Sequence, residues 1–462
     1  MYYRIKQLTL LVGDCLILYA GLFLAIFVRI SKLPTNEWDV LFFPMTQLFI
    51  LAILIFFIVG LYDVGQSKNR WPFFQKIILA MGIWFVFGII YFYLSPRTDV
   101  QPKTIMLLCA AIGTLLISAW RAVYNRFLSI AMLKTNIVFV GLTDETVEII
   151  KKLEDEPETG YEVIGVVAGA DELSRQNLND PKKYSVADNL VVLMRQITKP
   201  VSYIIVTPAM AQNTEVAKEL YHQLVNQIST INFVSFYEDI MKRIPPSTFS
   251  ESWFLANLQE QDKKIYDRFK IIVDFIFALL MGIVFAVTFP LVSLAIKLSS
   301  PGSIFFSQER TGRHGEAFKI YKYRTMKTLA KDGSAETGGA QFAAENDQRV
   351  TGVGKFLRKA RIDELPQFIN IFRNEMSLIG PRPERPEFVA QLTALMPYYS
   401  LRHLIKPGLT GWAQIKKSYY GSIEENLHKL EYDLYYLKNR GPLLDAAIVL
   451  KTFKILGRMA GR

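Results

Sequence analysis

The chain has 462 residues, of which 51% are hydrophobic, and it carries a formal net charge of +11 at pH 7. This length favours more than one domain, and the hydrophobic content is high for a soluble protein. Two cysteines and four histidines without ligand-like spacing argue against a disulfide framework, a thiolate zinc site or another transition-metal site. Because membrane-length segments are also present, the positive charge predicts contact with anionic lipids and phosphorylated substrates, and no binding of nucleic acid.

The first third of the chain contains four long apolar segments, at residues 8–28, 41–62, 77–94 and 105–120. Each approaches or reaches the length needed to cross a bilayer core, so residues 1–130 are predicted to form a unit of four transmembrane helices. The first segment lacks a small-residue cleavage site and three similar segments follow, which argues against a signal peptide. The basic residues of the short loops place both ends of this unit, and everything after residue 134, in the cytoplasm.

Residues 134–245 change character, because short apolar runs alternate with helical patterns. NIVFVG (136–141), YEVIGVVAG (161–169), YIIVTPA (203–209) and INFVSF (231–236) read as strands. This alternation predicts a doubly wound, Rossmann-like domain with a parallel sheet. Only Gly141 of the dinucleotide-binding glycine fingerprint is present in the first turn, GLTDET (141–146). A structural or regulatory module is therefore favoured over a nucleotide-binding one.

A fifth apolar run, residues 271–296, has basic residues on both flanks and Pro290 inside it. Positive charge on both sides indicates that neither end has been exported, and an internal proline kinks or breaks a helix. These two features favour a re-entrant hairpin, entering and leaving by the cytoplasmic face, over an ordinary spanning helix.

Two adjacent carboxylates, Asp363 and Glu364, stand in RIDELPQF (361–368). One explanation is an acidic helix start, with Asp363 as the N-cap and Pro366 in the first turn. The other is a phosphoryl-transfer site, in which one carboxylate attacks phosphorus and the other holds an oxygen-seeking cation. An apolar stripe of Leu365, Phe368, Ile369 and Phe372 would bury one helix face and hold the pair in place.

The following motifs decide between these explanations: SPGSIFFSQERTGRHGEAFKIYKYRTM (300–326), NDQRVTGVGKFLRKARIDELPQFINIFRNEMSLIGPRPERPEF (346–388), KPGLTGWAQI (406–415) and EYDLYYLKN (431–439). Together they resemble the bacterial sugar transferases, the polyprenyl-phosphate glycosyl-1-phosphate transferases, in the long multidomain branch of that family. The resemblance covers about 265–460 and implies a catalytic domain at 262–462 that includes the re-entrant helix. It implies Asp363 as the catalytic nucleophile and Glu364 as its catalytic partner and the ligand of Mg²⁺.

The resemblance also implies the reaction and its place. A sugar 1-phosphate would pass from a nucleotide diphosphate sugar, with UDP-glucose or UDP-galactose leading, to undecaprenyl phosphate at the cytoplasmic face of the bacterial plasma membrane. This step would begin the synthesis of a surface glycan. A transporter and a membrane-anchored nucleotide-binding regulator are the alternatives, and the oligomeric state is left open, a homodimer included.

Five basic residues are predicted to bind the substrate phosphates: Lys322, Arg324, Arg358, Arg361 and Arg382. Two prolines fix the backbone around Arg382, and an arginine fork suits a phosphate. Solvated helix charges explain Arg358 and Arg361 equally well, and a strand with one basic face is the alternative for Lys322 and Arg324. Trp412 is expected to pack rather than to stack on a base, and residues 329–346 are predicted to form a mobile lid.

Overall fold

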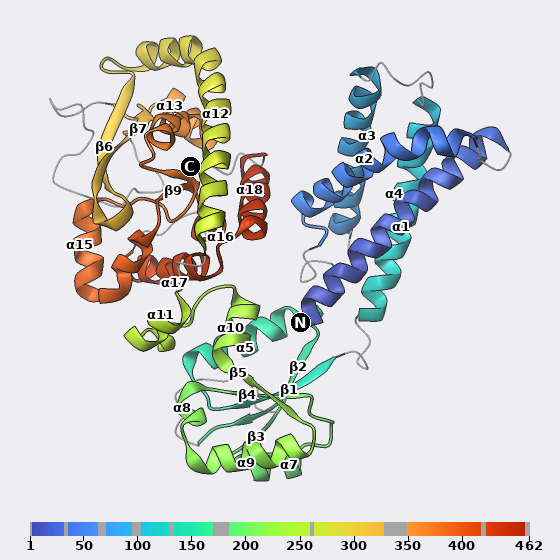
Figure 1. Ribbon diagram of the computed structural model, residues 1–462, viewed down its shortest axis with the longest axis vertical. Helices are drawn as coiled ribbons and strands as arrows, with labels where there is room; N and C mark the ends of the chain where they lie inside the picture. Colours follow the sequence, from blue (N-terminus) through green and yellow to red (C-terminus); the bar gives the residue numbers. More distant parts are fainter. Residues whose placement is uncertain are drawn as a thin grey trace. The chain divides into compact units, whose positions relative to one another are not determined.

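A computed structural model describes residues 2–31, 36–62, 71–94, 103–128, 134–169, 184–258, 263–327, 349–416 and 422–457. The chain divides into two compact units, Met1–Phe236 and Tyr237–Arg462. Figure 1 shows the helices and strands of both. Each unit is described by itself.

The first unit begins with four long apolar helices: α1 (Tyr2–Ile30), α2 (Asn36–Val59), α3 (Trp71–Leu94) and α4 (Lys103–Leu128). With α12 of the second unit they make five helices, among the described residues, that are long and apolar enough to cross a membrane. A buried ion pair joins Asp14 of α1 to Arg121 of α4, and Arg121 also donates to the Leu61 carbonyl at 2.8 Å. These helices are those of a membrane protein. The orientation of the four helices stays a prediction.

The first unit also contains a parallel five-stranded sheet with the order β3-β2-β1-β4-β5. Its strands are β1 (Thr135–Val140), β2 (Tyr161–Val167), β3 (Ser185–Ala187), β4 (Tyr203–Val206) and β5 (Ser229–Asn232). The helices between the strands are α5 (Asp144–Asp155), η3 (Pro157–Thr159), α7 (Leu190–Gln196), α8 (Pro208–Ala211) and α9 (Thr214–Val225). The predicted parallel sheet is therefore present.

The single fingerprint glycine has a packing explanation. Gly141 follows β1 with a φ of 99°, and a Cβ there would lie 2.3 Å from the Thr207 hydroxyl and 2.9 Å from Met210. Only glycine tolerates both the backbone conformation and this close approach. Protein side chains, not a ligand, therefore account for Gly141.

The predicted strand INFVSF is partly wrong. β5 ends at Asn232, and helix α10 (Phe233–Met241) begins at the next residue. Phe233 and Phe236, three residues apart on one helix face, are both buried, and the Phe236 ring packs against Phe139 of β1. Two aromatic residues at this spacing fit a helical face as well as a strand, and burial against the sheet selects the helix. The edge strand β3 was not predicted.

The second unit contains six further elements before the dyad: η4 (Pro246–Thr248), α11 (Glu251–Asn257), α12 (Lys264–Ser299), β6 (Phe305–Thr311), η6 (Arg313–Gly315) and β7 (Ala317–Tyr323). Around and after the dyad lie α13 (Gly352–Lys359), η7 (Ile362–Gln367), α14 (Phe368–Phe372), β8 (Ser377–Ile379), α15 (Pro386–Leu395), η8 (Pro397–Leu404), β9 (Gly408–Thr410), α16 (Trp412–Lys416), α17 (Ile423–Asn439) and α18 (Pro442–Gly457). β6 and β7 form an antiparallel pair, and β8 and β9 a parallel pair.

Helix α12 has two faces and a bend. The structure assigns one helix from Lys264 to Ser299 with Pro290 inside it, and its ribbon changes direction in the yellow part of Figure 1. Ala278 and Ile296 are buried against the unit, whereas Leu279, Ile283, Val287 and Leu291 are at least half exposed. The exposed apolar face is what a membrane-embedded helix presents to lipid. Re-entry through one membrane face stays a prediction.

Candidate active site

The acidic pair lies on the short 3₁₀ helix η7 rather than at the start of an α-helix. Arg361 adopts the left-handed conformation with φ 58°, occupies the N-cap position and makes no side-chain capping bond. Asp363 and Glu364 stand in the first turn of η7, so they do lie at an acidic helix start, but the N-cap is Arg361 and not Asp363, and Pro366 lies further inside. A positive φ at a non-glycine residue is uncommon, and such conformations gather at functional sites. With three residues per turn, neighbouring side chains on η7 point about 120° apart.

Glu364 accepts from three cations of three different segments. Oε1 lies 3.0 Å from Lys322 Nζ on β7 and 2.9 Å from Arg382 NH2 in the loop after β8. Oε2 lies 3.4 Å from Arg361 NH1. The side chains of Arg382, Arg361 and Lys322 remain 35%, 33% and 19% exposed, respectively, so they are accessible to an incoming anion. Glu364 thereby gathers the cations at one accessible place.

The pKa values of the two carboxylates are shifted in opposite directions. Burial opposes the charge of Glu364, but Lys322, Arg382 and Arg361 together hold its pKa well below the ordinary value. Burial, and then the charge of Glu364, raise the pKa of Asp363 to about 6. Glu364 is therefore held as an anion by its three cations. Asp363 is also ionised at neutral pH, and its buried Oδ1 has no hydrogen-bond partner among the described residues.

Asn370, which was not among the predicted site residues, joins the helix after the pair to a neighbouring strand. Its amide nitrogen donates to the Lys319 carbonyl and to the Glu375 carboxylate, both at 2.7 Å, and its Oδ1 accepts from the Tyr321 amide at 3.2 Å. It thus fastens α14 to β7, the strand that carries Lys322. An asparagine in an apolar stretch of sequence gives no signal of such a role.

The predicted apolar stripe after the pair is split between two short elements. Leu365 lies on η7, whereas Phe368, Ile369 and Phe372 lie on α14, and Phe372 is 37% exposed. Phe368 packs its ring 5.2 Å from the Phe285 ring of α12. Phe372 likewise packs its ring 5.0 Å from the Phe275 ring of α12, so the stripe anchors the pair to α12 through both phenylalanines.

Four of the five predicted phosphate-binding residues surround the pair. Lys322, Arg361 and Arg382 contact Glu364, as given above. Arg358 donates through Nε to the Thr325 hydroxyl at 2.8 Å, and its charge, like that of Arg361, favours the ionised form of Asp363. Four cations thus oppose two carboxylates, which leaves a net positive site suited to a diphosphate.

Arg324 is the exception, and its predicted role as a phosphate ligand is not supported. Its guanidinium donates to the carbonyls of Pro301 and Ser300 at 2.6 and 2.7 Å, and to Ile296 at 3.4 Å. These carbonyls lie at and just beyond the end of α12, where helix carbonyls lack intrahelical partners. Because β7 ends at Tyr323, Lys322 and Arg324 do not share a continuous strand face. Arg324 caps the end of α12.

Glycines bring the two loops beside the pair into backbone contact. A Cβ on Gly408 would lie 2.0 Å from the Gly380 nitrogen, and one on Gly411 would lie 2.1 Å from the Gly380 carbonyl oxygen. Trp412 is buried, donates to the Lys242 carbonyl at 2.8 Å and stacks on Tyr435, so it packs, as predicted. The predicted lid at 329–346 lies outside the described residues.

The residues present fit the expected Mg²⁺. The ion is usually held by one or two carboxylates together with substrate phosphates and waters. Asp363 Oδ1 is uncommitted within the described chain, and Glu364 Oε2 accepts from Arg361 alone among the ion pairs described. Glu364, beside Asp363, would hold the ion. Because the site already carries excess positive charge, the ion is expected to bind together with the phosphates of the substrate.

Comparison with known proteins gives the site a context. The family model for bacterial sugar transferases matches residues 265–458. The chain is 46% identical over 164 residues to the UDP-N-acetylgalactosamine-undecaprenyl-phosphate N-acetylgalactosaminephosphotransferase of Aeromonas hydrophila, across 36% of this chain and 38% of that protein. It is 30% identical over 323 residues to the UDP-glucose:undecaprenyl-phosphate glucose-1-phosphate transferase of Escherichia coli K12, across 66% of this chain and 64% of that protein.

The chain is also similar to the UDP-glucose:undecaprenyl-phosphate glucose-1-phosphate transferase of Klebsiella pneumoniae. The two are 27% identical over 465 residues, which cover 95% of this chain and 93% of that protein. The alignments thus span 38% and 64% of the first two relatives and nearly all of the third. The dyad and the four cations around it fall inside the matched residues 265–458. The resemblance predicted from the motifs is confirmed.

Proposed function

We propose, because this chain belongs to the bacterial sugar transferase family, that it moves a sugar 1-phosphate from a UDP-sugar to undecaprenyl phosphate. This is the first membrane step in making a surface glycan such as an exopolysaccharide, a capsule or an O-antigen. The observation that carries the proposal is the buried pair, in which Glu364 holds three cations while Asp363 keeps an uncommitted oxygen within the described chain.

The reaction would proceed in two displacements. A carboxylate oxygen of Asp363 forms a bond to the phosphorus that bears the sugar, the bond from that phosphorus to the UMP oxygen breaks, and UMP leaves with the electron pair. A phosphate oxygen of undecaprenyl phosphate then attacks the same phosphorus, and the bond to Asp363 breaks, which regenerates the carboxylate. Phosphoryl transfer depends mainly on positioning and charge neutralisation. Lys322, Arg358, Arg361 and Arg382 would supply both for the diphosphate.

Mg²⁺, when bound at Glu364, would neutralise charge on the transferring phosphoryl oxygens. Glu364 would also keep Lys322 and Arg382 oriented toward the diphosphate. Burial would exclude water from the aspartyl phosphosugar, which limits its hydrolysis.

A donor panel tests the proposed reaction. Purified protein in lipid is expected to release UMP and to transfer label into extractable lipid with UDP-glucose or UDP-galactose, and the release should require undecaprenyl phosphate for multiple turnovers. UDP-N-acetylgalactosamine belongs in the panel because the Aeromonas relative is named for it. Absence of lipid product with all three donors would contradict the proposal, and it would leave a transporter or a nucleotide-binding regulator to be tested by substrate flux and by UDP binding.

Labelling of single cysteines tests the proposed topology. Ala256 before α12 and Ser303 after it are both exposed, and the two native cysteines lie inside α1 and α4. If α12 re-enters the cytoplasmic face, Ala256→Cys and Ser303→Cys will both react with an impermeant maleimide in inverted vesicles and neither in intact cells. Labelling of Ser303→Cys alone in intact cells would mean that α12 spans the membrane.

A further inference from the structure

The loop that carries Arg382 is held by its backbone carbonyls. Those of four successive residues, 381–384, each accept a hydrogen bond, and the donors belong to three elements of the second unit, β6, η8 and β9. Gly408 N donates to Pro381 O at 2.8 Å, and Thr311 N donates to Glu384 O at 2.9 Å. The two carbonyls between them accept from arginine side chains. A loop held in this way has one backbone path, and that path sets the direction of the Arg382 side chain.

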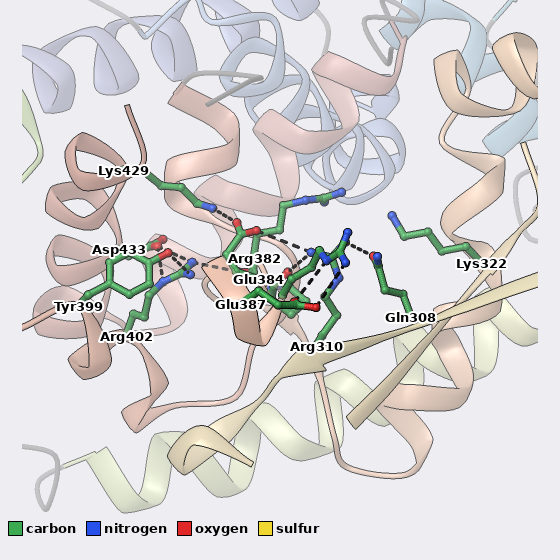
Figure 2. Close-up of polar contacts among 12 residues, drawn as sticks. Gln308, Arg310, Lys322, Arg382, Glu384, Glu387, Tyr399, Arg402, Lys429 and Asp433 are labelled. Carbon is green, nitrogen blue, oxygen red and sulfur yellow. Dashed lines mark hydrogen bonds and ion pairs between the residues drawn. The ribbon is translucent and has the colours of Figure 1, made fainter. Parts of the chain in front are cut away.

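Arg402 of η8 is the side chain that holds the Arg382 carbonyl itself. It is 1% exposed, and its NH2 lies 2.9 Å from Arg382 O. Its Nε lies 3.1 Å from Asp433 Oδ2, and its NH1 donates to the Tyr399 hydroxyl at 2.8 Å. Figure 2 shows the Arg402 guanidinium next to the oxygens of Asp433 and Tyr399, with Arg382 and Glu384 labelled on its other side. Asp433 and Tyr399 together fix the plane of the guanidinium, so the donor that faces Arg382 O has a fixed position.

Arg310 of β6 holds the next carbonyl. Its NH1 donates to Pro383 O at 3.2 Å, and its NH2 donates to Gln308 Oε1 at 2.7 Å. Glu384 lies between Arg310 and Lys429, and it forms ion pairs with both. Burial opposes its charge, but Lys429, Arg402 and Arg310 lower its pKa to about 2. Glu384 therefore stays ionised at physiological pH.

We propose that Arg402 is a positioning residue for sugar-phosphate transfer, which acts by fixing the backbone of Arg382 and hence the approach of its guanidinium to Glu364 and to the diphosphate. Arg402 contacts neither carboxylate of the pair. Arg310 supports the same loop one residue further on. The expected effect of Arg402 on kcat rests on the proposed function. Its role in holding the Arg382 backbone does not depend on the reaction.

The test uses the full chain in lipid nanodiscs with the double variant Arg402→Met/Asp433→Asn. Removing both partners avoids leaving one charge buried and unpaired, which is the usual reason such variants fail to fold. Exchange of the backbone amides at residues 380–385, which are those of Gly380, Arg382, Glu384 and Arg385 because Pro381 and Pro383 have no N–H, is expected to accelerate. Because a displacement of about 1 Å can cost roughly 100-fold in rate, kcat for transfer is expected to fall about 10- to 100-fold. The fall should appear equally in kcat/KM, as for a contact that acts in the transition state.

The matched control is Arg243→Met/Glu431→Gln. Arg243 and Glu431 form a second buried ion pair, 3.1 Å apart, and Glu431 lies two residues from Asp433 on α17. This control variant should lose about as much thermal stability as Arg402→Met/Asp433→Asn. Its amide exchange at 380–385 and its kcat should stay at the wild-type values. Arg402→Lys, which keeps a cation for Asp433 but loses the planar fork, should give a smaller loss of kcat than the double variant.

The outcomes separate the two proposals. Unchanged exchange at 380–385 in Arg402→Met/Asp433→Asn would overturn the positioning role, whatever the activity. Faster exchange with undiminished kcat would overturn its link to transfer, as would an equal loss of kcat in the control. A wild-type protein that transfers no sugar phosphate would overturn the proposed function instead, while the exchange measurement would still decide whether Arg402 fixes the loop.

Discussion

Asp363→Asn is expected to abolish sugar-phosphate transfer while the fold stays intact. The amide has nearly the same shape as the carboxylate, but it cannot form the aspartyl phosphosugar, and loss of a covalent nucleophile costs roughly 1,000-fold or more. Intact-protein mass spectrometry after incubation with donor alone should show an added hexose phosphate on the wild type and none on the variant. Asp239→Asn, at a side chain that is 64% exposed, is the matched control. Wild-type turnover in Asp363→Asn would remove the nucleophile assignment.

The same experiment has a pH signature. Because burial and the neighbouring charge of Glu364 raise the pKa of Asp363 to about 6, the nucleophile becomes protonated as the pH falls through that value. The rate of adduct formation should therefore be near its plateau at neutral pH and fall by about tenfold per pH unit well below pH 6. A profile that stays flat down to pH 4.5 would show that Asp363 is not the titrating nucleophile.

Glu364→Gln is also expected to lower activity strongly. The variant keeps the shape but removes the charge that gathers Lys322, Arg361 and Arg382, and it removes the proposed Mg²⁺ ligand. Truncating one member of a buried ionic cluster costs about 3–5 kcal/mol. If about half of that loss appears in the transition state, turnover will fall by roughly 10- to 100-fold. The dependence of the remaining activity on Mg²⁺ concentration should weaken in parallel.

A second property of Glu364→Gln separates electrostatics from general damage. The negative charge of Glu364 raises the pKa of Asp363, so its removal should shift the acid limb of adduct formation to lower pH. A variant that is merely misfolded would form less adduct, but the pH at which the rate of adduct formation falls would not change. Full activity of the wild type in EDTA would contradict the metal assignment, and an acid limb moved to higher pH would contradict the electrostatic account of the pair.

The hydropathy and motif patterns of single segments were sufficient to predict the long helices, the parallel sheet and the location of the acidic pair. The four N-terminal apolar segments correspond to α1, α2, α3 and α4, because length and hydropathy are properties of one segment alone. The alternation of strands and helices predicted the parallel sheet for the same reason. The pair was found through the order of several motifs. Pattern failed at 233–236, where helix and strand periods cannot be told apart over four residues and burial of Phe233 and Phe236 decided the outcome.

By itself, then, the sequence determined which segments are apolar enough for a membrane, where the parallel sheet lies, and that Asp363 and Glu364 are adjacent in a sugar transferase motif. Only the tertiary structure decided what each basic residue contacts. Lys322 reaches Glu364 across 42 positions, whereas Arg324, two residues later, turns to the end of α12. Arg402 reaches the Arg382 carbonyl across 20 positions. The physical reason is that periodicity and composition act within one element, whereas the partner of a buried charge is set by which elements pack together and by the carbonyls and carboxylates that this packing leaves to be satisfied.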